Sequence, residues 1–74
     1  MYMEQRIRFD KLIYSPSIVH RAIEDFQQSH DVHIVGESAS HIEVRFCSEV
    51  SIETVIGEFC NYLIQLANRT DIMP

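Results

Sequence analysis

The sequence predicts a small α+β domain whose elements follow the order strand, helix, strand, strand, helix. Two observations predict this class: short segments in which apolar and polar residues alternate, and two longer segments in which apolar residues recur at helical spacing. At 74 residues the chain is too short for two ordinary domains, and a domain of this size buries only about 60% of its unfolded surface. We therefore expect residues 1–74 to form a single domain with one thin core.

The first predicted strand covers residues 3–10. Met3, Ile7 and Phe9 fall on one side of it, as expected for a half-buried strand. The other side carries the charged residues Glu4, Arg6, Arg8 and Asp10.

The first predicted helix covers residues 16–29. Ser15 suits the N-cap, and Pro16 suits the first helical position because its backbone angle is preset. Apolar residues then recur over an arc of about 140°: Ile18, Val19, Ala22, Ile23 and Phe26. This helix is expected to bury one face.

Residues 31–36 and 41–47 are predicted to form a hairpin closed by the loop 36–40. Ile42, Val44 and Phe46 alternate along its second strand and define an apolar sheet face. The opposite face is expected to be mostly polar and charged, and its members are Arg6, Arg8, His33, Val35, His41, Glu43 and Arg45.

The last predicted helix follows Ser51, a plausible cap, and runs to about Asn68. Its apolar stripe spans roughly 200° when Tyr62 is included, although about 100° suffices for a helix that faces one core. Two explanations stand open: the helix contacts something outside its own domain, or the first helix covers the additional flank.

Two helices on one face of a three-stranded, mostly antiparallel sheet give an α+β sandwich. A right-handed crossover followed by the hairpin predicts a ferredoxin-like arrangement that lacks its last strand. The third strand would then lie between the other two. The outer edge of the first strand would be open, and open edges recruit other strands.

Charge and composition exclude several functional classes. A net charge of −5 with scattered basic residues disfavours nucleic acid as a partner. The N-terminus lacks the pattern of a signal peptide, and no apolar run approaches the roughly 18 residues that span a membrane. We expect a cytoplasmic protein in which Cys47 and Cys60 are reduced thiols, without contact to membranes.

No pattern in the sequence identifies a catalytic, metal or cofactor site. His30, His33, Cys47 and Cys60 have zinc-ligand chemistry, but their expected positions need not converge. Ser17, His20, Glu24 and Asp25 contain the residue types of a nucleophile and its base, yet helix capping and a solvated helix face explain them more simply. We therefore predict a protein that is not an enzyme and has no catalytic residue, metal or cofactor.

Two segments resemble HxsD, the small D component of the His-Xaa-Ser peptide maturation systems. The first segment comprises Ile7-Arg8-Phe9-Asp10, Tyr14, Val19, Arg21-Ala22 and Phe26. The second comprises Gly57-Glu58-Phe59, Asn61 and Arg69. The resemblance implies a non-catalytic accessory protein that works with radical SAM enzymes, which modify a ribosomally made peptide and supply the iron-sulfur chemistry themselves.

The sequence thus predicts a binding module that holds a precursor peptide or a radical SAM maturation enzyme. The expected contact surface is either the open edge of the first strand or the broad apolar side of the last helix. The predicted partner-binding residues are Glu4, Arg6, Arg8, Asp10, Glu58, Asn61, Tyr62, Leu66 and Arg69. The alternative is a homo-oligomeric structural or regulatory protein, such as a homodimer, with no role in peptide maturation.

Overall fold

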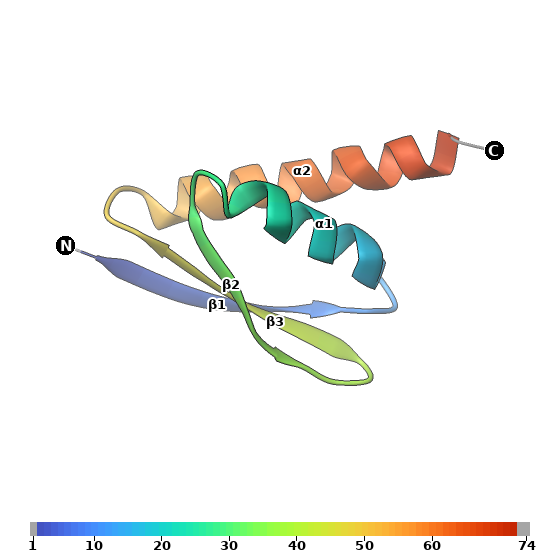
Figure 1. The fold of residues 1–74 in the computed structure, drawn as a ribbon, viewed down its shortest axis with the longest axis horizontal. Coiled ribbons are helices and arrows are strands. Elements are labelled where there is room, and N and C mark those ends of the chain that lie inside the picture. Colours follow the sequence, from blue (N-terminus) through green and yellow to red (C-terminus); the bar gives the residue numbers. More distant parts are fainter. Residues whose placement is uncertain (1, 73–74) are drawn as a thin grey trace.

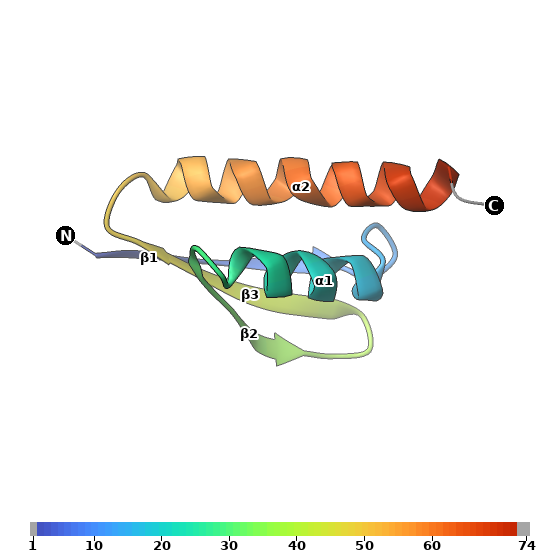
Figure 2. The same ribbon diagram turned by 45° about the horizontal axis from the view of Figure 1, so that its top comes forward.

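Three strands form one antiparallel sheet, and two helices lie together on one of its faces (Figures 1 and 2). The computed structural model describes the backbone of residues 2–72 and the side chains of residues 2–68. The elements are β1 (Met3–Asp10), α1 (Pro16–Phe26), β2 (Asp31–Glu37), β3 (His41–Ser48) and α2 (Ile52–Ile72). The sheet order is β1-β3-β2, so the predicted α+β class and the central position of the third strand are both confirmed.

Both helices begin close to their predicted starts. The Ser51 hydroxyl accepts a hydrogen bond from the Thr54 amide at 3.2 Å, which caps α2 as expected. Ser15 precedes α1, but its side chain makes no capping bond to the backbone. The geometry of Pro16 at the first helical turn therefore starts α1 without help from the Ser15 hydroxyl.

The two helices differ from prediction at their C-terminal ends. α1 ends at Phe26, because the Phe26 carbonyl accepts amides from both Ser29 at 3.1 Å and His30 at 2.8 Å in a tight turn that leads into β2. α2 continues past the expected end at Asn68 as far as Ile72. No glycine or proline lies between Asn68 and Pro74, so the sequence after Asn68 contains no residue that would stop the helix there.

Phe59 on α2 lies at the centre of the core. Its ring packs against Phe9 of β1 at 5.8 Å between centroids, Phe26 of α1 at 5.2 Å and Phe46 of β3 at 5.1 Å. Phe46 and Phe59 have no exposed surface. One side chain therefore joins both helices to the two strands that lie beneath α2.

A β-bulge at Val35 reverses the side of the sheet on which the last side chains of β2 lie. Ile34 lies opposite Val44, whereas Gly36 lies opposite Glu43, so Val35 is an extra residue. Glu37 consequently lies opposite Ile42, a residue of the helix-covered face. Simple alternation from Val32 would have placed Glu37 on the uncovered face.

Replacing Phe59 with alanine is expected to lower the free energy of unfolding by about 3–5 kcal/mol, because the change leaves a cavity where three rings meet. Urea denaturation followed by circular dichroism measures this loss. Phe59→Leu retains most of the apolar volume and is expected to cost clearly less than Phe59→Ala. A loss below about 1 kcal/mol for Phe59→Ala would show that the core does not depend on this contact.

Candidate functional site

The outer edge of β1 presents unpaired backbone groups in a fixed pattern. The Lys11 amide donates to the Ser40 carbonyl at 2.9 Å, one step beyond the paired residues Asp10 and His41. In an antiparallel pair, alternate residues turn their backbone groups toward the partner strand. Odd-numbered residues of β1 therefore bond β3, and Glu4, Arg6 and Arg8 direct their N–H and C=O groups outward. No strand pairs with this edge within residues 2–72.

The opposite edge of the sheet is closed by two local features. The same alternation directs the backbone groups of Val32 outward from β2, and the Val32 carbonyl accepts a hydrogen bond from the Gln27 side chain at 3.0 Å. Farther along, the bulge at Val35 interrupts the regular ladder. A bulge and a capped carbonyl both hinder pairing with another strand. β1 has neither feature, because its register with β3 is continuous from Met3 to Asp10.

One flank of α2 is covered by α1. The Tyr62 ring lies 5.7 Å from the Phe26 ring, and the Tyr62 hydroxyl donates a hydrogen bond to the Asp25 carboxylate. α1 packs over β2, whereas α2 packs over β3 and β1. The flank of α2 that points away from α1 therefore lies on the side of the open β1 edge.

That outward flank of α2 is apolar. Ile56, Cys60 and Ile64 recur every four residues, which places them within an arc of about 80° on the side of the helix opposite Tyr62. Ile56 and Cys60 are half-buried, and 56% of Ile64 is exposed. Burial raises the pKa of the Cys60 thiol, so Cys60 is a neutral, packing side chain.

These features together define the candidate site, which we call the β1 edge surface. It consists of the outward backbone groups of Glu4, Arg6 and Arg8 and of the apolar flank of Ile56, Cys60 and Ile64. α1 therefore covers one flank of the wide apolar stripe of α2, as one of the two explanations expected, and the flank on the side of β1 remains partly exposed.

The charged side chains of β1 project from the face of the sheet that carries no helix. Arg6 contacts Glu4 at 3.4 Å, from Nε to Oε2, and Glu43 of β3 at 3.7 Å, from Nη1 to Oε2. Asp10 accepts the Leu12 amide at 2.8 Å and so stabilises the turn after the strand. Arg8 makes no ion pair with any side chain of residues 2–68, although it lies opposite Glu43 in the register. Arg8 is therefore the unneutralised cation beside the open edge.

The predicted residues of α2 lie apart from the β1 edge surface. Glu58 and Asn61 are exposed and line, with Tyr62, a cavity of about 400 Å³ between the two helices. Leu66 was predicted as a partner-binding residue, but only 5% of it is exposed and it packs in the core, so the expectation that it is accessible to a partner was wrong. The Arg69 side chain lies outside the described residues. The structure therefore does not bring the strand residues and the helix residues into one site.

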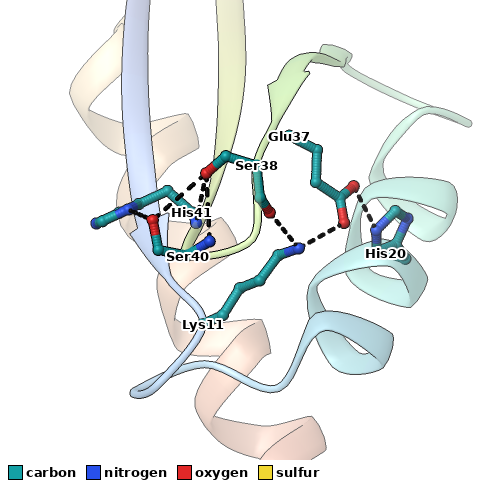
Figure 3. Close-up of polar contacts among 6 residues, drawn as sticks. All are labelled: Lys11, His20, Glu37, Ser38, Ser40 and His41. Atoms are coloured by element: carbon teal, nitrogen blue, oxygen red, sulfur yellow. Dashed lines mark hydrogen bonds and ion pairs between the residues drawn. The ribbon is translucent and has the colours of Figure 1, made fainter.

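A polar cluster joins the end of β1, the hairpin and α1 (Figure 3). Lys11 donates to the Ser38 carbonyl at 2.6 Å and pairs with Glu37 at 3.0 Å, and Glu37 also contacts His20 at 3.1 Å. The hydrogen bond from Lys11 is the main reason that the pKa of Glu37 lies below its ordinary value. Sequence reasoning did not identify this cluster, because the bulge that turns Glu37 toward α1 has no clear sequence signature.

The same cluster contains a serine and a histidine in contact. The Ser40 hydroxyl lies 2.8 Å from His41 Nδ1. No carboxylate within residues 2–68 contacts His41 to orient it, as a catalytic triad requires. The Ser38 hydroxyl accepts the amides of Ser40 at 3.3 Å and His41 at 3.1 Å, so these groups close the hairpin turn.

Tyr2 and Asp31 form a clasp across the uncovered face at the other end of the sheet. The Tyr2 hydroxyl donates to Asp31, which raises the pKa of Tyr2 to about 12 and lowers the pKa of Asp31. His33 contacts the second Asp31 oxygen at 2.8 Å. Cys47 of β3 lies opposite Asp31 in the register and is only 7% exposed. Hydrogen bonding therefore accounts for Tyr2, Asp31 and His33, and packing accounts for Cys47.

The residues weighed as metal ligands do not converge in the described part of the chain. Within residues 2–68, no three His, Cys, Asp or Glu side chains are grouped so that they could hold a metal ion. Cys60 lies on α2 and His33 on the opposite, uncovered face of the sheet. A cavity of about 600 Å³ lies beside the clasp at the start of α2, and its lining contains no lysine or arginine.

Comparison of the chain with protein-family models, curated proteins and solved structures finds no match. Among the described residues, neither helix has the length and apolar character needed to cross a bilayer.

The Lys11–Glu37 contact predicts a specific pH dependence of stability. The pKa of Glu37 is lower in the folded than in the unfolded chain, so its stabilising contribution is present above about pH 4.3 and is lost as the pH falls through the folded-state value. The wild type should therefore lose more stability than Glu37→Gln between about pH 6 and about pH 3.

Urea unfolding at a series of pH values measures this difference. Lys11→Met removes the same contact from the other side and should reduce the pH dependence in the same way. A constant difference between the wild type and Glu37→Gln across this range would contradict the assignment.

Proposed function

We propose that this chain is a non-catalytic binding protein that holds another polypeptide by adding it as a fourth strand beside β1. One observation carries the proposal: β1 is a regular edge that no strand within residues 2–72 pairs with, and it lies beside a partly exposed apolar flank of α2, whereas a side-chain cap and a bulge interrupt the other edge. Strand addition at such an edge is a recurring mode of peptide recognition, in which backbone hydrogen bonds supply affinity and alternate side chains supply specificity.

The resemblance to HxsD supports a specific biological setting for this binding. It implies that the bound polypeptide is a precursor peptide, or an extended segment of the radical SAM enzyme that modifies it. An accessory protein of this kind holds its partner and leaves the chemistry to the enzyme. The described residues are compatible with leaving the chemistry to the enzyme. Turns, the Tyr2–Asp31 clasp and ion pairs account for the contacts of their serine, histidine and carboxylate groups.

The backbone pattern of β1 supplies a selective way to test the proposal. The Arg8 amide points outward and makes no bond to β3, so proline at this position removes a docking group without removing a ladder hydrogen bond of the sheet. The proline ring also obstructs the approach of another strand. Arg8→Ala is the matched control because it removes the side chain and keeps the outward amide.

Arg8→Pro is expected to weaken partner binding by at least about tenfold, equivalent to about 1.4 kcal/mol, whereas Arg8→Ala, which keeps the outward amide, is expected to weaken it clearly less. The tagged protein and both variants are purified from the native cell, and the bound radical SAM enzyme or small peptide is quantified by mass spectrometry. Circular dichroism and urea unfolding establish that each variant is folded. Equal recovery by folded Arg8→Pro and wild type would exclude the β1 edge as the binding surface.

Ile64→Asp tests the helix half of the same surface. Ile64 is mostly exposed, so the change should cost little stability, but it places a carboxylate where the proposed strand would lie. We expect weaker partner recovery with this variant. Gln65→Asp, one residue along on an exposed part of the helix outside this flank, is the control and should leave recovery unchanged.

A further inference from the structure

We infer that the occupant of the β1 edge surface is one extended segment, antiparallel to β1, with apolar side chains toward α2 and a carboxylate opposite Arg8. This inference rests on the proposed function and adds the chemical class of the bound segment. The antiparallel direction follows the rest of the sheet, in which both pairs of strands are antiparallel. Three features of the structure carry the rest: the partly exposed apolar flank of α2, the alternation along β1 and the unpaired charge of Arg8.

The apolar flank of α2 that points away from α1 lies on the side of the β1 edge. α2 packs over β3 and β1, whereas α1 packs over β2. On this flank Ile56 and Cys60 are half-buried and Ile64 is mostly exposed. Neighbouring strands lie about 4.8 Å apart, so one strand added beside β1 would extend the sheet next to this flank.

The alternation along β1 determines which side chains of the added strand meet the helix. Gln5 lies opposite Phe46 and Ile7 opposite Val44, so both side chains project toward the helix-covered face. Gln5 is exposed and Ile7 is only half-buried, which shows that α2 does not seal this side of β1. Residues of the added strand opposite Gln5 and Ile7 would lie beneath the apolar flank of α2, and aliphatic side chains suit that position.

Residues of the added strand on the uncovered face meet the charged side of β1. Arg6 is already neutralised by Glu4 and Glu43, whereas Arg8 has no ion-pair partner among the described side chains. Opposite charges that face each other across neighbouring strands stabilise the pair, and like charges destabilise it. A carboxylate opposite Arg8 is therefore the complementary choice, and a residue that carries no negative charge suits the position opposite Glu4.

A second copy of this chain is a poorer occupant. Charge alone does not exclude it, because antiparallel pairing of two β1 strands centred on Gln5 would set Glu4 of one copy opposite Arg6 of the other. In that register, however, Arg8 of each copy would lie opposite Tyr2 of the other and would still lack a carboxylate. Pairing centred on Arg6 would set two arginines opposite each other, and like charges in that position destabilise the pair.

Two synthetic peptides of equal composition test the inference. The first has a core of aspartate, valine, threonine, valine and lysine, which places aspartate opposite Arg8 and both valines beneath α2. The second places the two valines next to each other, so that only one can face the helix. Nuclear magnetic resonance titration and amide exchange suit the weak affinity expected of short peptides.

We expect the alternating peptide to bind more tightly than its control and to protect the amides of Glu4, Arg6 and Arg8, while those of Val32 and Ile34 on β2 are unchanged. Arg8→Gln should lower the affinity for this peptide by about two- to fivefold. A peptide with asparagine in place of aspartate should bind the wild type and Arg8→Gln equally.

Several outcomes would overturn the inference: no binding of either peptide, equal binding of both, or protection confined to β2. A stable dimer that Arg8→Pro dissociates, seen by sedimentation equilibrium, would instead identify a second copy as the occupant.

If the natural partner is still lost with Arg8→Pro while the alternating peptide does not bind, the assigned class of segment is wrong and the proposed function stands. If the peptide binds at β1 but Arg8→Pro retains the natural partner, the proposed function fails.

Discussion

The central position of β3 is the constraint on which the rest of this structure depends. Alternate residues of β3 form hydrogen bonds to β1 and to β2. The backbone groups of Ile7 and Phe9 therefore bond β3, whereas those of Arg6 and Arg8 face outward. It also fixes the helix-covered face through Ile42, Val44 and Phe46, which are fully buried. Phe59 then packs on Phe46, and α2 is held above β3 and β1.

The two edges of the sheet differ because different local contacts act on them. On β2, Gln27 caps the Val32 carbonyl, the extra residue Val35 bends the ladder, and Glu37 turns toward α1 to meet His20 and Lys11. Exposed edges invite unwanted pairing, and such features limit it. β1 lacks these features along its whole length. This asymmetry is the physical reason to regard β1 as a binding edge.

Residues 2–72 contain three strands and leave one side of β1 without a partner, which links the fold to the proposed role. A small core leaves little stability in reserve, and a strand added beside β1 would cover part of the exposed surface of Ile56, Cys60 and Ile64. Binding and folding would then reinforce each other, since a partner that binds only the folded chain stabilises it. The proposed role, in which the chain holds another polypeptide, would make use of this coupling.

The sequence by itself determined the order of the elements, the identity of the apolar sheet face and most element boundaries, because these follow from local periodicity in Ile7, Phe9, Ile42, Val44 and Phe46. It also indicated an open first strand and a helix with too much apolar surface. Only the tertiary structure decided which flank of α2 remains uncovered, because this depends on where α1 packs.

The tertiary structure likewise placed Leu66 in the core and turned Glu37 toward Lys11 and His20. Helical periodicity gives the angle of a side chain around its own axis but not the distance to the neighbouring element, and alternation along a strand fails wherever a bulge adds a residue. The sequence therefore predicted the open edge of β1 from its pattern of residues. The packing of distant elements determined which apolar residues of α2 lie beside that edge.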